Sequence, residues 1–145
     1  ETMKVRFFGE SVKIGDLSFS ELDLTLMYID KGLTVPQLAK RLEIGIVSTN
    51  KILKHFKIPT NSGLDGLTAR SYRVLRYINW HITKRGVAPG VCFIAKKLKM
   101  KQPAVSYHIK QLIDNGYLIR DNETKFKITK KGKDKIGNIK MFNNF

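Results

Sequence analysis

Residues 102–111 carry polar side chains at the spacing of one helix face. Helical periodicity turns Val105, His108 and Ile109 inward, so the other side chains of the stretch face outward. The outward residues are Gln102, Ala104, Ser106, Tyr107, Lys110 and Gln111. Amide, hydroxyl and ammonium groups hydrogen-bond to base edges in the DNA major groove, and a small apolar group such as Ala104 contacts the thymine methyl. We therefore predict a helix over residues 103–115, with Gln102 in the turn before it, whose outward side chains contact DNA bases.

Basic residues surround the predicted helix in the sequence. We expect them to contact phosphate, either beside the helix or from a β-hairpin that follows it. They are Arg70, Arg73, Lys96, Lys97, Lys99, Lys101, Arg120, Lys125 and Lys127. Arg70, Arg73 and Arg76 lie near the start of an expected helix, where the helix dipole disfavours cations. A nearby phosphate or acidic neighbours would offset this cost, and the sequence leaves both explanations open.

The net charge supports a polyanionic partner. The 145 residues contain 27 Lys and Arg against 12 Asp and Glu, a formal charge of +15. Residues 1–60 contribute only +2, and the remaining residues contribute +13. The hydrophobic fraction of 42% is sufficient for a packed core, so the charge is not that of a disordered tail. Most of the electrostatic attraction is expected from the second part of the chain.

In the first part of the chain we expect a β-hairpin followed by three helices. The hairpin strands are predicted over 4–8 and 12–19, around residues 9–11. A helix capped by Ser18 or Ser20 should continue to about Lys31, with Leu22, Leu26 and Ile29 buried. Thr34 caps a helix over 35–42, with Pro36 in its first turn. A third helix is expected from about residue 48 to 56.

In the second part we expect helices, a hairpin and a basic tail. Thr68 caps a helix that continues to about residue 84, and further helices are expected over 91–98 and 103–115. Strands over 117–121 and 125–129 form the hairpin, and a basic helix over 130–139 follows. These elements predict a mainly α fold with a small β component (α+β). We expect an N-terminal unit over 1–58, a linker over 59–67 and a winged-helix domain over 68–145, which includes the basic helix and tail.

The two parts share an internal repeat with an offset of 56 residues. The small Ala39 aligns with Ala95, and each copy consists of a short helix, a turn and a second helix. A small residue at this place lets two helices cross closely, which is the pattern of a helix-turn-helix. In the first copy, the outward residues of the second helix are Ser48, Asn50, Lys51 and Lys54, of which we expect Lys54 to contact phosphate and the others to contact bases.

Residues 34–56 (TVPQLAKRLEIGIVSTNKILKHF) look like a bacterial helix-turn-helix. Residues 91–120 (VCFIAKKLKMKQPAVSYHIKQLIDNGYLIR) resemble the winged helix of MarR-like and ArsR-like regulators, and residues 85–89 are similar to the segment before the winged helix of the SOS repressor. The resemblance covers roughly residues 20–58 and 68–136. The resemblance implies tandem DNA-binding units. The sequence shows neither the metal-ligand motif of ArsR-like regulators nor the protease domain of the SOS repressor, so we expect neither of their sensing mechanisms in this protein. Ile46 and Val47 stand where the first motif usually begins its polar base contacts.

These observations predict a sequence-specific, double-stranded DNA-binding transcriptional regulator, either a repressor or an activator. An enzyme is not expected, because the sequence has no paired carboxylates, nucleophile–base pair or phosphate-binding glycine loop. Cys92, His55, His81 and His108 lack ligand spacing, so neither a metal nor another cofactor is expected. The single cysteine and the lack of a long apolar run favour a cytoplasmic, nucleoid-associated protein without a membrane partner. The sequence identifies no small-molecule effector.

Two alternatives remain open. The chain could be a DNA-binding replication, partition or recombination accessory protein of a mobile element. Its first unit could then serve dimerisation or protein interaction, in agreement with its small net charge. For the assembly on DNA, a homodimer on a palindrome is favoured, although one chain could also place its two motifs in adjacent grooves.

Overall fold

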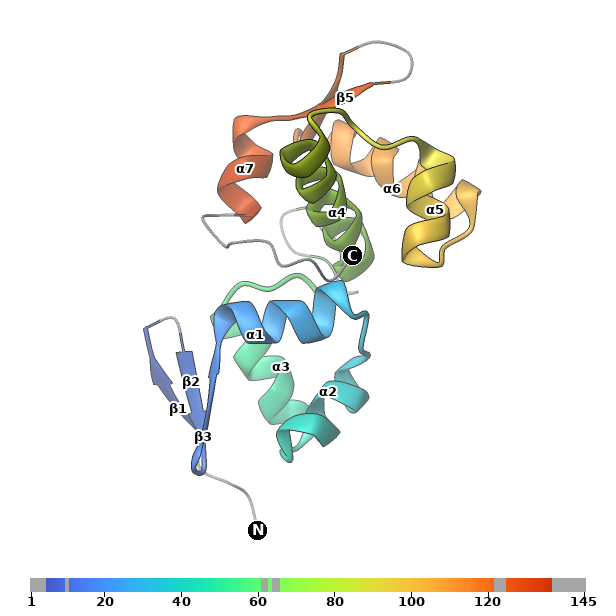
Figure 1. Ribbon diagram of the computed structural model, residues 1–145. Helices are drawn as coiled ribbons and strands as arrows, with labels where there is room; N and C mark the ends of the chain where they lie inside the picture. Colours follow the sequence, from blue (N-terminus) through green and yellow to red (C-terminus); the bar gives the residue numbers. More distant parts are fainter. Residues whose placement is uncertain (1–4, 10, 61–62, 64–65, 122–124, 137–145) are drawn as a thin grey trace.

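The computed structural model describes residues 5–9, 11–60, 63, 66–121 and 125–136. Figure 1 shows two lobes, one with the β1–β3 sheet and helices α1 to α3, the other with helices α4 to α7 and the β4–β5 hairpin. The described elements are mostly helices with two small antiparallel sheets, which confirms the expected α+β class. No helix among the described residues is long and apolar enough to cross a membrane.

The N-terminal sheet has three strands, β1 (Val5–Phe8), β2 (Ser11–Ile14) and β3 (Leu17–Ser20), in the order β1-β2-β3. The prediction of a single strand over 12–19 was therefore wrong. Gly15 has a φ of 59°, a left-handed conformation that suits glycine, and it turns the chain between β2 and β3. The Gly-Asp sequence at residues 15–16 was the local signal for this turn.

The first helical segment combines α1 (Glu21–Thr25) with a π-helical stretch, η1 (Leu26–Asp30). Ser20 and Asp23 form a capping box, so Ser20, and not Ser18, is the N-cap of α1. The wider π turn changes the angle between successive side chains, so Tyr28, Ile29 and Asp30 are all buried. The expected inward residues Leu22 and Leu26 are only half-buried, because periodicity at 3.6 residues does not hold through this segment.

Helices α2 (Val35–Leu42) and α3 (Ile46–His55) complete the first lobe. Helix α2 has the expected bounds and a capping box between Thr34 and Gln37. Helix α3 begins two residues earlier than expected, because Gly45 in extended conformation acts as its N-cap. The earlier start places Ile46 and Val47 in the first turn of α3, where both are exposed.

The second lobe contains α4 (Ala69–Arg85), α5 (Val91–Leu98), α6 (Gln102–Asp114), β4 (Leu118–Arg120), β5 (Phe126–Ile128) and α7 (Lys130–Ile136). Helix α6 is displaced by one residue from the expected 103–115, so Gln102 lies in its first turn. Both strands of the hairpin are shorter than expected at each end. The last helix was expected to reach residue 139, which lies outside the described residues.

Backbone hydrogen bonds repeat between the α2–α3 and α5–α6 pairs at the same offset as the sequence repeat. The amide of Ile44 donates to the carbonyl of Ala39 over 3.1 Å, and that of Met100 donates to Ala95 over 2.9 Å. The first helix of each pair ends at a non-glycine residue in the left-handed conformation, Glu43 with a φ of 59° and Lys99 with a φ of 57°. The two turns therefore have the same local geometry, although their side chains differ in charge.

A buried ion pair joins the two lobes. Arg76 of α4 is fully buried, and its Nε and Nη2 donate to the two carboxylate oxygens of Asp30 over 2.8 and 2.9 Å. Burial alone lowers the pKa of Arg76, but the hydrogen bonds and negative charge of Asp30 outweigh it, so the pKa of Arg76 is raised. Arg76 is therefore explained by an acidic neighbour, one of the two possibilities that the sequence left open.

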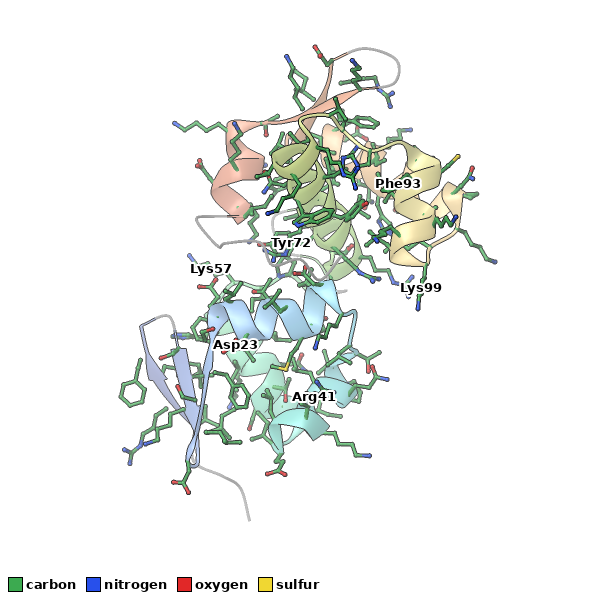
Figure 2. All side chains as sticks on the ribbon, viewed as in Figure 1. Asp23, Arg41, Lys57, Tyr72, Phe93 and Lys99 are labelled. Carbon is green, nitrogen blue, oxygen red and sulfur yellow. The ribbon has the colours of Figure 1, made fainter. Side chains whose placement is uncertain are left out.

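The same junction is closed by contacts of α7, of the two residues before the predicted linker and of Leu67 within it. The hydroxyl of Tyr72 donates to the carbonyl of Lys135 over 3.2 Å, and the Lys135 ammonium donates to the carbonyl of Lys57 over 3.1 Å. Figure 2 shows Lys57 and Tyr72 at this junction. Ile58 and Leu67 are buried in the hydrophobic core, which includes residues of both lobes. The two lobes therefore form a common core in spite of their different charge.

We expect Asp30→Ala to lower the free energy of unfolding by about 3–5 kcal/mol, because it leaves a buried guanidinium without its counter-charge. The exposed pair between Asp121 and Lys127, at 3.6 Å, provides a matched control. Asp121→Ala should cost less than about 1 kcal/mol. Urea unfolding curves of the two variants measure the difference, and equal losses would contradict a role for the buried pair.

Candidate nucleic-acid interface

The outward face of α6 is accessible over its length. Val105, His108, Ile109 and Leu112 are buried against the core, as the inward periodicity predicted. Six residues of α6 were expected to contact bases. Those that are exposed are Gln102, Ser106, Tyr107 and Lys110, and those that are half-buried are Ala104 and Gln111. Helix α6 therefore presents amide, hydroxyl and ammonium groups on one surface.

Part of this face is held in place by side-chain hydrogen bonds. The amide of Gln111 donates to the hydroxyl of Tyr107 over 2.8 Å, one helical turn away. The amide of Asn115 donates to the carbonyl of Gln111 over 2.8 Å and so satisfies a carbonyl at the end of the helix. Tyr107 is 58% exposed, so its ring stands out from the surface between Ser106 and Lys110. The first of these bonds reduces the freedom of the Tyr107 and Gln111 side chains.

Four exposed lysines lie at the end of α5 and in the turn that leads to α6, namely Lys96, Lys97, Lys99 and Lys101. Lys96 and Lys97 lie in the last turn of α5, where the negative end of the helix dipole stabilises cations. Lys99 is the left-handed C-cap of α5, and Lys101 is the N-cap residue of α6. Figure 2 shows Lys99 at the end of α5 that lies toward the first lobe.

A cleft of about 430 Å³ lies between this turn, the start of α4 and the loop after η1. The cleft brings together five of the predicted site residues, namely Arg70, Arg73, Lys99, Lys101 and Ala104. Arg70 is exposed, but Arg73 is half-buried, and its Nη1 donates to the carbonyl of Leu98 over 3.3 Å. Burial lowers the pKa of Arg73, and the charge of Asp30 opposes this effect. Arg73 thus ties α4 to the end of α5 in addition to lining the cleft.

His108 lines the same cleft from the inward side of α6. Only 8% of the residue is exposed, and its Nδ1 has no hydrogen-bond partner within the described part of the chain. Burial and, secondarily, the positive charge of Arg70 lower the pKa of His108 below its ordinary value of 6.5. The ring is therefore neutral at neutral pH, and no hydrogen bond within the described residues satisfies its Nδ1.

The β4–β5 hairpin forms the base of the expected wing. The guanidinium of Arg120 lies over the ring of Phe126 at 5.0 Å from the centroid, which directs this side chain along the hairpin. Lys125 and Lys127 are exposed, and Lys127 lies 3.6 Å from Asp121. Residues 122–124 at the tip lie outside the described residues.

The predicted residues of the first unit lie on α3, in the other lobe from α6 (Figure 1). Asn50, Lys51 and Lys54 are exposed, and Ser48 is half-buried. The first turn of α3 carries Ile46 and Val47, which are 49% and 68% exposed. The exposed face of α3 therefore combines an apolar beginning with polar and basic residues farther along, whereas that of α6 carries the polar Gln102 in its first turn.

Sequence reasoning missed the contribution of the first lobe to the cleft. Gly32, Leu33 and Thr34 line it from the loop after η1. Gly32 has a φ of 71°, and the Arg73 guanidinium packs directly beside it. Gly32 directly follows Lys31, where the first helix was expected to end, and nothing in the sequence indicates that Arg73 lies across from it. Among the described residues no group of three or more His, Cys, Asp or Glu side chains has the placement of a metal site.

Comparison with known protein families gives one match. Residues 64–125 match the LexA DNA binding domain, a segment that begins before α4 and ends just before β5. The match covers less than half of the chain and supports a helix-turn-helix DNA-binding protein. A search of curated proteins found no match. The resemblance to MarR-like and ArsR-like regulators and the role of the first unit as a second DNA-binding motif stay predictions.

The lowered pKa of His108 predicts a pH dependence of stability. The unfolded chain binds a proton at this histidine near pH 6.5, whereas the folded chain binds it only at lower pH. The free energy of unfolding should therefore fall as the pH drops below 6.5, by at most about 1.4 kcal/mol per pH unit for one proton. His108→Gln should reduce this slope, whereas His55→Gln, at an exposed position, should keep it. Unfolding curves between about pH 7 and 5 measure the slopes, and an unchanged slope in His108→Gln would refute the assignment.

Proposed function

We propose that the protein is a sequence-specific transcriptional regulator that binds double-stranded DNA with α6 in the major groove. The observation that carries the proposal is the exposed polar face of α6 beside the lysines of the α5–α6 turn. A helix fits the major groove, so Gln102 and Ser106 contact base edges, with Gln102 suited to adenine. The family match over residues 64–125 supports DNA as the partner.

The basic residues around α6 contribute affinity through phosphate contacts. Lys99 and Lys101 flank the start of α6, and Arg70 lies across the cleft from them. The β4–β5 hairpin carries Arg120 and Lys125 as the wing. Phosphate contacts fix the position of a protein on the duplex without selecting the sequence. We therefore assign specificity to α6 and most of the non-specific affinity to the turn and the wing.

For the first lobe we propose a role in dimerisation. Ile46 and Val47 are exposed at the start of α3, and at the offset of the repeat they correspond to Gln102 and Pro103 of α6. Phe8 and Leu17 of the N-terminal sheet are 56% and 54% exposed as well. Contiguous exposed apolar side chains, such as those of the neighbouring Ile46 and Val47, mark interaction surfaces. A homodimer formed through the first lobe would place two copies of α6 on a palindromic site.

Binding to DNA should depend strongly on salt, because each phosphate contact releases counterions. If about 6–10 phosphates are contacted, the association constant should fall about 10³- to 10⁵-fold between roughly 50 and 200 mM salt. Fluorescence anisotropy with a labelled duplex measures this dependence. An affinity that is insensitive to salt would rule out the proposed mode of binding.

Gln102→Ala should weaken binding to the preferred sequence by about 1–3 kcal/mol and leave binding to random duplex nearly unchanged. Lys99→Ala should instead weaken binding to both duplexes to a similar extent, because its contact is with phosphate. Arg85→Ala, which removes an exposed cation at the other end of α4, serves as the control for net charge. The preferred sequence is first selected from a random duplex library. Equal losses for Gln102→Ala on both duplexes would refute its role in base recognition.

A further inference from the structure

The cleft between the two lobes has the size of a small-molecule site. Its volume of about 430 Å³ lies within the range of about 300–1,000 Å³ that is common for ligand pockets. Its walls come from three places in the sequence: the loop after η1, the first two turns of α4, and the α5–α6 turn with the beginning of α6. Pockets of this kind often form where two lobes meet.

The polar part of the cleft is cationic. Arg70, Arg73, Lys99 and Lys101 line it, and no aspartate or glutamate is among the lining residues that the structure describes. The nearest carboxylate on the arginine side, Asp30, holds Arg76 through both of its oxygens. Four cations around one small volume repel each other, and an anion placed among them would relieve this repulsion.

Two polar atoms in the wall lack a partner. His108 is more than nine-tenths buried and its Nδ1 makes no hydrogen bond, and the Nε of Arg73 is likewise buried and unpaired among the described residues. Buried polar atoms in folded proteins are nearly always paired with protein, water or ligand. Both residues line the cleft from opposite helices, α6 and α4. These two atoms themselves have almost no accessible surface, so they lie behind the wall of the cleft and do not face it directly.

The rest of the lining is apolar. Ile29 and Leu33 contribute from the first lobe, and Leu98 and Met100 contribute from the α5–α6 turn. A bare inorganic anion would leave these side chains without contact. An apolar body attached to the anionic group would cover them, which is the usual division of a ligand pocket into an apolar wall and a few polar groups.

We propose that this cleft binds a small amphipathic anion, with a phosphate or carboxylate group among the lining cations, chiefly Arg70 and Arg73, and a compact apolar body against the apolar lining. The ligand is a free small molecule and not a phosphate of the DNA backbone, because a backbone phosphate carries no apolar body to cover the apolar lining of the cleft.

The proposed ligand would oppose DNA binding. This step rests on the proposed function, in which Arg70, Lys99 and Lys101 contact DNA phosphates. A bound anion neutralises these cations and so weakens binding of the duplex. Linkage then requires that DNA weakens binding of the anion by the same factor. The cleft would thus act as the effector site of the regulator.

Phenyl phosphate is a suitable probe, because it joins a phosphate to an apolar ring. We expect saturable binding to the full chain without DNA at constant ionic strength, at least about tenfold tighter than that of inorganic phosphate. Calorimetry gives the affinity, and NMR signals of the His108 ring report the location. Arg70→Ala and Arg73→Gln should each weaken binding about tenfold or more, whereas Arg85→Ala should not. Arg70 is exposed, so Arg70→Ala remains informative if Arg73→Gln destabilises the fold.

The proposal is overturned if phenyl phosphate does not bind at up to about 10 mM, a concentration at which even weak sites of millimolar Kd are occupied. It is also overturned if inorganic phosphate binds equally well, or if Arg70→Ala has no effect on phenyl phosphate. Loss of DNA affinity in Arg70→Ala without any binding of phenyl phosphate would assign the cleft to the DNA backbone instead. Binding of phenyl phosphate by a chain that does not bind duplex DNA would refute the proposed function and leave the ligand site standing.

Discussion

The ion pair between Asp30 and Arg76 determines how the two halves of the chain meet. Both groups are buried, so neither can be left without the other, and the pair forms only when η1 lies along α4. A buried pair of this kind contributes little net stability compared with apolar residues, but it penalises other arrangements of the two lobes. The position of the α5–α6 turn relative to the first lobe, and with it the cleft, follows from this contact.

The internal repeat shows how one local geometry serves two purposes. The turns at Glu43 and Lys99 share their left-handed conformation and their hydrogen bonds, so the backbone of both pairs is built alike. The side chains that the backbone does not constrain differ, with Ile46 and Val47 exposed at the start of α3 and Gln102 at the start of α6. Geometry alone therefore does not assign a function to α3. The apolar start favours our proposal that the first lobe contacts protein, and α6 carries the polar face suited to bases.

Local signals predicted most of the elements, and contacts between distant residues could not be predicted. The bounds of α2 and α5 follow from Thr34, Pro36 and the αL turns, because caps depend only on neighbouring residues. The π turn in η1 changes which side chains are buried, and the spacing of apolar residues in the sequence does not indicate this change. Asp30 and Arg76 are 46 residues apart, so neither shows its partner in the sequence. For the candidate site, the face of α6 was predictable from spacing, whereas the cleft requires the first lobe to be in place.

The cations of the cleft lower the stability of the fold and at the same time favour the binding of an anion. Charges of one sign held close together destabilise a fold unless an opposite charge compensates them, and natural proteins accept this cost at functional sites. Arg76 has its compensation in Asp30, but Arg73 is half-buried beside a carboxylate that is already engaged, and its pKa is lowered by burial. The unpaired Nδ1 of His108 adds to the same cost. A fold selected for stability alone would have placed an acidic residue here, so the uncompensated charge is best explained by an anion that comes from outside the chain.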